Sequence, residues 1–239
     1  MPAQQSRAVR GCERVRRDLP LLLSPTVLFP GDKSLLSLQG NRERAMVEGC
    51  LRGDGYLGVV FVRQWKEVME PCEVGTVARI LHVEASADER LNVVVRGEQR
   101  FRIVEMLQYE PYPMARVELL PNRFGTISTE LTRIANRLAA LLYRYLELKA
   151  IADRLALADL MLPTDLAALG FRIGALLDLP LREKQRLLET EDLTELLQCE
   201  LDILSREIRR LQRATVWREL LQTDAARRRR IPPDLAVWN

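Results

Sequence analysis

The stretch LPLLLSPTVLFPG, residues 19–31, decides how the fold begins. It is apolar and follows two arginines, which is how the charged and apolar regions of a secretory signal begin. However, Pro20, Pro25 and Pro30 exclude an uninterrupted apolar helix, because each proline removes a backbone donor and fixes φ. The run is also far shorter than the roughly 20 residues of a membrane-spanning helix. We therefore expect an extended edge segment that ends in a Pro-Gly turn and forms the first strand of a soluble protein.

The composition indicates an ordinary globular protein. A chain of 239 residues with 47% hydrophobic and 29% charged residues can form one large domain or two small ones with a buried core. Its cysteines, Cys12, Cys50, Cys72 and Cys199, are scattered and form no CxxC pair, so neither a zinc knuckle nor a redox motif is present. We expect free thiols in a reducing cytosol, and hence a cytoplasmic protein without a membrane segment.

The net charge of +3 is unevenly distributed. Residues 1–18 carry +3 and residues 205–230 carry +6, which leaves −6 for residues 19–204. The body of the protein is therefore acidic and the basic charge lies at the ends. This distribution argues against nucleic-acid recognition by the body as a whole.

The first half favours short strands over helices. Apolar or alternating runs predict strands at residues 19–31, 33–38, 56–62, 75–84, 91–96, 101–107 and 115–120. Gly97 is expected to separate the fifth strand from the sixth, and residues 109–113 to turn the chain. Because turns rather than crossover helices separate these strands, they predict a small barrel or a strongly curved sheet.

Three local features interrupt this pattern. Asn41 is a candidate N-cap for a short helix that Gly53 ends. Residues 63–71 read as a charged loop. The spacing of Val77 and Leu81 does not fit strict alternation and indicates a β-bulge.

From Ser128 onwards the apolar period changes to that of helices. One long amphipathic helix is expected there, and a second covers residues 151–162 before Pro163. Thr164 is expected to cap a third helix, and a short fourth covers residues 184–188. The last helix is expected to start at a Thr190 cap and to continue to Gln222.

A heptad pattern marks the last helix. Its apolar residues are Leu197, Leu201, Leu204, Ile208 and Leu211. The pattern fits a helix packed in a bundle, and it also fits a homo-oligomer that pairs through residues 197–211.

The predicted organisation is a flexible arm at 1–18, a β-rich subdomain at 19–122, a helical bundle at 123–222 and a basic disordered tail at 223–239.

The sequence offers no recognisable catalytic machinery. The single histidine, His82, lies within a predicted strand with no acidic or thiol cluster nearby. Phosphate-binding glycine loops, a nucleophile elbow and an HExxH zinc motif are all absent. We therefore predict a protein that is not an enzyme and has no catalytic residue, cofactor or metal.

Aromatic and methionine side chains next to turns are the remaining candidates for a functional site. They are Trp65, Met69, Tyr109, Tyr112 and Met114. Such side chains can bind apolar polypeptide segments with little specificity. The alternative is that each one closes an end of the barrel.

Three stretches in this order resemble the N-terminal, substrate-binding domain of Lon proteases. They are LP with VLFPG at 19–31, GTVARI at 75–80 leading to VVVRGEQRFRI at 93–103, and EKQRLLETEDLTELL at 183–197. The resemblance implies an α+β fold, with a PUA-like curved β-sheet followed by a helical bundle that ends in a long helix. The residues that carry the family motif are Pro20, Phe29, Pro30, Gly31, Gly75, Thr76, Gly97 and Arg100.

The resemblance has two departures. A full Lon protease continues into an ATPase and a Ser-Lys peptidase domain, whereas this sequence ends at Asn239, as expected of a stand-alone domain. In addition, Ser24-Pro25-Thr26 stands where the family commonly has an Arg-Asp pair, so contacts that depend on that pair do not carry over.

The leading functional hypothesis is a protein-recognition module that binds unfolded or apolar polypeptide segments, or a partner protein, as the resemblance implies. One alternative is nucleic-acid binding through the PUA-like barrel and the Arg-rich tails, against which the acidic body argues. Another is an assembly or regulatory partner that pairs through the last helix.

Overall fold

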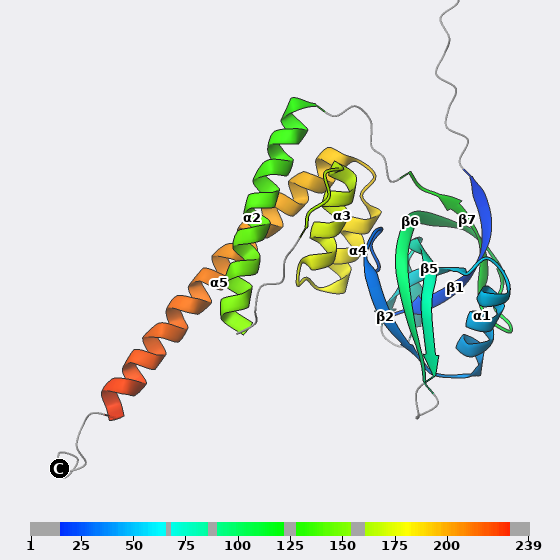
Figure 1. The fold of residues 1–239 in the computed structure, drawn as a ribbon, viewed down its shortest axis with the longest axis horizontal. Helices are drawn as coiled ribbons and strands as arrows, with labels where there is room; N and C mark the ends of the chain where they lie inside the picture. Colours follow the sequence, from blue (N-terminus) through cyan, green and yellow to red (C-terminus); the bar gives the residue numbers. More distant parts are fainter. Residues whose placement is uncertain (1–14, 66–67, 86–89, 122–127, 154–160, 230–239) are drawn as a thin grey trace, which may run out of the picture. The chain divides into compact units, whose positions relative to one another are not determined.

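The computed structural model describes residues 15–65, 68–85, 90–121, 128–153 and 161–229 (Figure 1). The side chains of residues 64–65, 68–69, 151–153 and 218–229 lie outside the described set. The chain forms two compact units. The β-rich unit comprises residues 1–124 and 174–189, and the helical unit comprises residues 125–173 and 190–239. This division differs from the predicted boundary at 122, because residues 174–189 belong with the strands.

The described residues of the β-rich unit include seven strands. They are β1 (Arg16–Ser24), β2 (Lys33–Leu38), β3 (Tyr56–Trp65), β4 (Val68–Pro71), β5 (Val74–Ala85), β6 (Leu91–Gln108) and β7 (Met114–Leu119). Pairing runs in the order β1-β7-β6-β5-β3 and returns from β3 to β1, so these five strands close into a ring (Figure 1). β2 adds to β6 and β4 adds to β3 outside the ring. This architecture confirms the predicted α+β class with a small barrel.

β1 closes the ring, so the expectation of an edge segment was wrong. Residues 16–20 pair antiparallel with β7, and residues 21–24 pair parallel with β3. Pro20 is the last residue in register with β7, at the point where β1 changes partners, so its missing N–H falls where the ladder switches. Residues 16–18, predicted to belong to a flexible arm, are therefore part of the sheet, while residues 1–14 lie outside the described residues.

Apolar side chains on both faces of the ring strands explain their continuous apolar sequences. One cluster fills the ring and draws on all five of its strands: Leu19, Leu21, Val60, Val77, Phe101, Ala115 and Val117. The second lies on the outer face, where helix α1 (Asn41–Arg52) and β2 cover it, and includes Leu22, Leu36, Met46, Leu57 and Val93. β1 and β3 therefore contribute to both cores, as a strand buried on both faces must.

The Phe29–Gly31 turn packs directly on the β5–β6 pair. Gly31 N–H donates to Gly97 O at 2.8 Å, and Gly97 N–H donates to Asp32 O at 2.9 Å. A Cβ atom on Gly97 would lie 2.3 Å from the carbonyl oxygen of Phe29. Gly97 is therefore a site of close backbone approach within a continuous β6, and the prediction that it breaks the strand was wrong.

Other residues of the predicted motif support the same turn. The Thr76 hydroxyl is buried and donates to Leu28 O at 2.6 Å. Phe29 and Pro30 are buried, and Gly31 has φ 83°, which favours glycine. A Cβ atom on Gly75 would lie 2.6 Å from Val59 O, so β3 and β5 also approach closely.

Arg100 connects β6 to helix α4 (Leu181–Glu189) inside the β-rich unit. Its side chain is 1% exposed, and its guanidinium donates to Leu188 O at 3.0 Å and to Pro121 O at 3.2 Å. Removing a buried cation that binds carbonyl oxygens destabilises a protein, because the carbonyls lose their hydrogen-bond partners. The fourth helix is longer than the predicted 184–188.

Three local predictions in this unit have clear outcomes. The bulge is confirmed, since the β5–β6 register shifts at Val77/Ala78 and again at Ile80/His82. The predicted loop at 63–71 was wrong, because β3 continues to Trp65 and pairs with β4 as a hairpin. The N-cap of α1 is Gly40 and makes no side-chain capping bond, so Asn41 is the first helical residue; the helix does end at Gly53.

The helical unit contains α2 (Thr129–Asp153), α3 (Leu166–Leu176, in this unit up to Ile173) and α5 (Leu193–Arg229). Asp165 and Asp192 cap α3 and α5 by accepting N–H bonds from Ala168 at 2.8 Å and Glu195 at 2.9 Å. The predicted caps Thr164 and Thr190 were therefore wrong. Residues 154–160 of the second predicted helix lie outside the described residues.

Four of the five heptad residues of α5 are buried within the chain itself, and the fifth, Leu211, is half-buried. Leu197, Leu201, Leu204 and Ile208 are each at most 8% exposed, and α5 packs along α2 in the same unit (Figure 1). An interface between copies through these side chains would have to open the helical unit. α5 continues to Arg229, so the predicted disordered tail from 223 was wrong over residues 223–229; residues 230–239 lie outside the described residues.

Gly97→Ala should lower the free energy of unfolding by about 2 kcal/mol or more, because the added methyl group meets the Phe29 carbonyl, which is backbone and cannot rotate away. Urea denaturation of the purified chain measures this. Arg96→Ala, one residue earlier on β6 with an exposed side chain, is the control and should change stability by about 0.5 kcal/mol or less. Equal effects of the two variants would contradict the role assigned to Gly97.

Arg100→Met should destabilise the protein by about 2 to 4 kcal/mol, because two carbonyl oxygens lose their buried donor while the volume is largely kept. The measurement is the thermal or urea midpoint, with Arg96→Met as the matched control. Hydrogen exchange should also show faster opening of residues 181–189 in Arg100→Met. Unchanged protection of that helix would count against the proposed link.

Candidate functional site

The turn between β6 and β7, residues 109–113, is the surface at which three of the predicted binding residues meet. Pro111 follows a cis peptide bond, and Gln108 Nε2 donates to Tyr112 O at 3.4 Å across the turn. On its far side, Pro113 O accepts a hydrogen bond of 2.8 Å from the backbone N–H of Leu21. The turn is therefore fixed to the strand that closes the ring.

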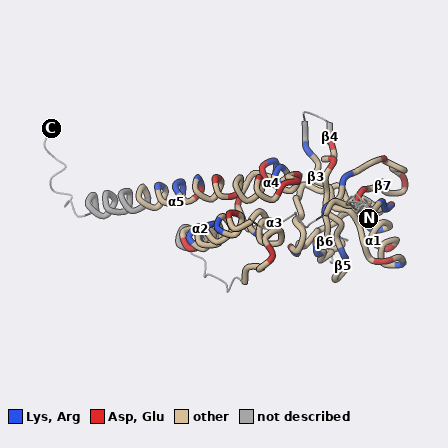
Figure 2. Tube along the Cα trace, turned by 90° about the horizontal axis from the view of Figure 1, so that it is seen from above, with Lys and Arg blue, Asp and Glu red and all other residues tan. Residues whose placement is uncertain are grey.

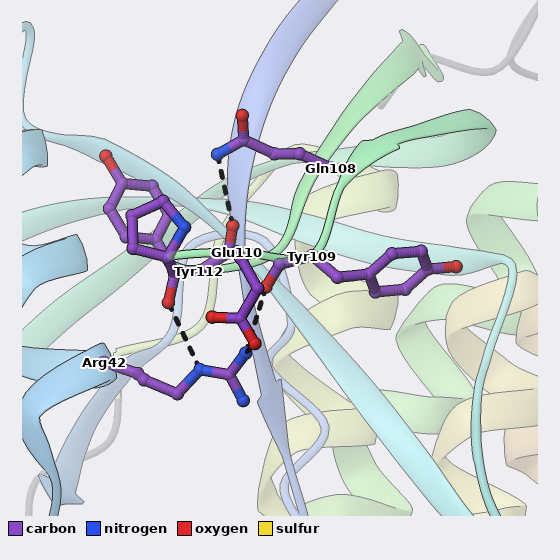
Figure 3. Close-up of polar contacts among 6 residues, drawn as sticks. Arg42, Gln108, Tyr109, Glu110 and Tyr112 are labelled. Atoms are coloured by element: carbon purple, nitrogen blue, oxygen red, sulfur yellow. Dashed lines mark hydrogen bonds and ion pairs between the residues drawn. The ribbon is translucent and has the colours of Figure 1, made fainter.

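Arg42, in the first turn of α1, holds the same turn from the other side (Figure 3). Its guanidinium donates to Pro111 O at 3.2 Å and to Tyr109 O at 3.3 Å, and it forms an ion pair with Glu110. The Arg42 and Glu110 side chains are largely exposed, so the ion pair itself contributes about 1 kcal/mol or less. The planar donor group nevertheless fixes the orientation of two backbone carbonyls.

The tyrosines of the turn lie in different environments. Tyr109 is 65% exposed and projects away from the Arg42 contacts (Figure 3). Tyr112 is half-buried, packs on the outer core and lies against α1, since a Cβ atom on Gly49 would be 2.8 Å from its hydroxyl. Met114, the first residue of β7, is also half-buried. Of the three, Tyr109 is the one available for contact, and Tyr112 mainly supports the surface.

Trp65 and Met69 belong to a different hairpin. Trp65 is opposite Val68, and Met69 is opposite Gln64, at the end of the β3–β4 pair. Their side chains lie outside the described residues. The five predicted residues thus come from two hairpins of the β-rich unit.

A hollow of about 160 Å³ lies beside the β6–β7 turn. Its lining comes from β1, α1 and the turn: Leu21, Leu22, Leu23, Arg42, Glu43, Met46, Tyr112 and Pro113. Leu23 is 41% exposed and Tyr109 is more so, which gives this face an apolar character next to the Arg42 guanidinium. We call the hollow together with Tyr109 the turn surface.

Sequence reasoning missed Arg42 and Met46 as parts of this surface. The separation of 69 residues between Arg42 and Pro111 hides their contact from any local pattern.

The three described thiols, Cys50, Cys72 and Cys199, show no sign of nucleophilic activation. Burial raises the pKa of the Cys50 thiol to about 11, with a smaller contribution from the Asp54 carboxylate. Burial also raises the pKa of Cys72. Partial burial and nearby acidic groups, Glu195 first, raise the pKa of the exposed Cys199. Thiolates are therefore scarce at neutral pH, and none of these residues suits covalent chemistry.

His82, the single histidine, is exposed on β5. Among the described residues, no group of three or more His, Cys, Asp or Glu side chains could hold a metal ion.

A search of the same residues finds no helix with the length and hydropathy needed to cross a bilayer. Cys12 and the Arg-rich residues 1–14 and 230–239, on which the nucleic-acid alternative depends, lie outside the described part of the chain.

Comparison with known proteins identifies one family. Residues 18–206 match the family model of the ATP-dependent protease La (LON) substrate-binding domain. Lon protease 2 of Myxococcus xanthus is 30% identical over 200 residues, which are 82% of this chain and 24% of that protein. A Lon protease of Anaeromyxobacter dehalogenans is 30% identical over 79% of this chain and 23% of its own length. The chain thus spans about a quarter of these relatives.

Solved structures agree on the fold. A Lon N-terminal domain protein from Xanthomonas campestris is 24% identical, with a TM-score of 0.58 over 76% of this chain and 95% of that one. The N-terminal domain of the Mycobacterium avium complex Lon protease is also 24% identical, with a TM-score of 0.60 over 79% of this chain and 98% of that one.

We predict that a disulfide-exchange thiol reagent at about pH 8 modifies Cys199 at least about tenfold faster than Cys50 or Cys72, because the latter are buried as well as protonated. The experiment uses a Cys12→Ser background and follows reagent release. Adding Cys199→Ser should remove the fast phase, and unfolding in urea should make the remaining thiols react alike. A fast phase that survives Cys199→Ser would contradict the burial of Cys50 and Cys72.

Proposed function

Because this chain belongs to the Lon substrate-binding domain family, we propose that its β-rich unit recognises unfolded or apolar segments of polypeptide chains and uses the turn surface to do so. The observation that carries the proposal is Tyr109, a 65% exposed aromatic side chain on a turn that Arg42 holds in place. An aromatic group on a fixed backbone loses little conformational entropy when it binds. Proteins that bind diverse partners commonly use such anchors.

The neighbouring chemistry supports a polypeptide over a small molecule. The hollow of about 160 Å³ is smaller than the roughly 300 to 1,000 Å³ of typical small-molecule pockets. It can accept one apolar side chain against Leu22, Leu23 and Met46. A segment crossing the turn could thus place one side chain in the hollow and another on Tyr109.

The proposal predicts that Tyr109→Ser weakens binding of a fluorescently labelled, permanently unfolded polypeptide by about fivefold to twentyfold, because loss of an aromatic anchor costs about 1 to 2 kcal/mol. Fluorescence anisotropy measures the affinity. Tyr109 makes no core contact, so the variant should keep the unfolding midpoint of the wild type.

Trp217→Ser is the matched control, because Trp217 is 66% exposed but lies on α5 in the helical unit. It should leave the affinity unchanged. No saturable binding by the wild-type chain would overturn the proposed function. A loss of affinity in Trp217→Ser with none in Tyr109→Ser would move the binding surface to α5.

A further inference from the structure

A second hollow, of about 250 Å³, lies between α4 and the β3–β4 hairpin of the β-rich unit. Its lining is polar and differs entirely from that of the turn surface: Arg63, Glu70, Arg182, Gln185, Arg186 and Glu189. Figure 2 shows basic and acidic residues gathered on α4. We call this hollow the α4 hollow.

Gln185 forms part of the wall of the α4 hollow and is 3% exposed. Its Nε2 donates to Val74 O at 2.9 Å and to Glu189 Oε1 at 2.8 Å. Both amide hydrogens are thereby used, and turning the amide over would place its oxygen against two acceptors. The orientation of the side chain is therefore fixed by its partners.

This orientation leaves the Gln185 oxygen without a donor. Oε1 is buried and has no hydrogen-bond partner among the described residues. A buried acceptor without a partner costs about 1 to 3 kcal/mol, so folded proteins rarely keep one without a reason. A donor supplied by a bound molecule would remove that cost.

The charges around the hollow indicate that the bound molecule which supplies this donor also carries an anionic group. Three arginines face two glutamates in the lining. Arg182 makes no hydrogen bond or ion pair with the described residues, and it is exposed at the start of α4. Arg63 lies beside the buried Cys72: burial raises the pKa of the Cys72 thiol, and the charge and hydrogen bond of Arg63 oppose that rise. Guanidinium groups bind carboxylates with two parallel hydrogen bonds.

We propose that the α4 hollow binds a carboxylate that carries an amide N–H beside it, as found at the C-terminal residue of a polypeptide or at an acidic residue within one. Because Oε1 is enclosed in the free protein, the Gln185 side chain must shift slightly toward the hollow for the amide N–H to donate to it. The carboxylate accepts from Arg182 and Arg186. The hollow is below the usual volume of a small-molecule pocket, which suits one residue of a chain. This inference rests on the proposed function and names a chemical group that the same unit recognises.

The test titrates three short labelled peptides of the same alanine-rich sequence into the full chain labelled with ¹⁵N. One has a free C-terminal carboxylate, one a C-terminal amide, and one a C-terminal amide with a single internal Asp. The side-chain amide signals of Gln185 report on the hollow, and their shift with concentration gives the affinity. We expect the free-carboxylate peptide to shift them saturably and to bind at least about tenfold more tightly than the amidated peptide.

Arg182→Gln with Arg186→Gln should weaken binding of the carboxylate peptide about tenfold or more, and about 0.5 M salt should weaken it further. Both side chains are exposed, so the variant should keep the wild-type unfolding midpoint. Arg79→Gln, at an exposed arginine of β5 outside the hollow, is the control and should bind as the wild type does. Tight binding of the internal-Asp peptide with the same arginine dependence would identify side-chain carboxylates as a source.

The proposal falls if neither carboxylate-bearing peptide shifts the Gln185 signals, or if their affinity is unchanged in the Arg182/Arg186 variant. Titration of the long unfolded polypeptide in parallel separates the two proposals. If it still binds with dependence on Tyr109, the polypeptide-recognition function stands and the α4 hollow has no part in it. If neither the long polypeptide nor the peptides bind, both proposals fail.

Discussion

The contact on which the β-rich unit depends is the approach of one stretch of backbone to another, where the Phe29–Gly31 turn meets Gly97 of β6. Reciprocal N–H bonds of 2.8 and 2.9 Å join the two, and the space for a Cβ atom at Gly97 is taken by the Phe29 carbonyl. Because Asp32 is part of this contact, β2 must leave the turn in register with β6, starting at Lys33 opposite Arg96. α1 follows and covers the outer core. The position of Arg42 over the β6–β7 turn is therefore set by a contact made by other residues.

The sequence predicts what depends on neighbouring residues. The bounds of β2, the bulge in β5 and the Gly53 stop all follow from local alternation or turn chemistry, and the structure confirms them. Prediction from the sequence fails where pairing with strands that are distant along the chain decides the structure. Three prolines suggested an edge for β1, yet the missing N–H of Pro20 falls at a change of partner. Likewise, Gly97 looks like a break locally, but only its contact with Phe29 shows why glycine is there.

The same distinction applies to the candidate site. The sequence alone was enough to select Tyr109, Tyr112 and Met114, because aromatic and methionine residues flank a proline-rich turn. It could not predict that these three side chains differ in exposure. The Thr164 and Thr190 caps failed for a different reason. Asp165 directly follows Thr164 and Asp192 lies two residues after Thr190, and in each case the carboxylate acceptor takes the cap. Gln185 is separated from Val74 by 111 residues, so its fixed orientation and unpartnered oxygen are visible only in the folded chain.

Under the two proposals, the turn surface and the α4 hollow recognise a polypeptide through different forces. The turn surface offers an aromatic side chain and apolar walls, which favour sequence-independent contact, whereas the α4 hollow offers charge and an orphaned acceptor, which demand a specific group. Each contact alone is weak, because one anchor or one carboxylate supplies only a few kcal/mol. A single polypeptide that reached both would gain affinity through the raised effective concentration of the second group once the first had bound. Selection for unfolded chains would follow, since a folded protein seldom offers an exposed apolar segment and an accessible carboxylate with a free amide N–H on one extended stretch.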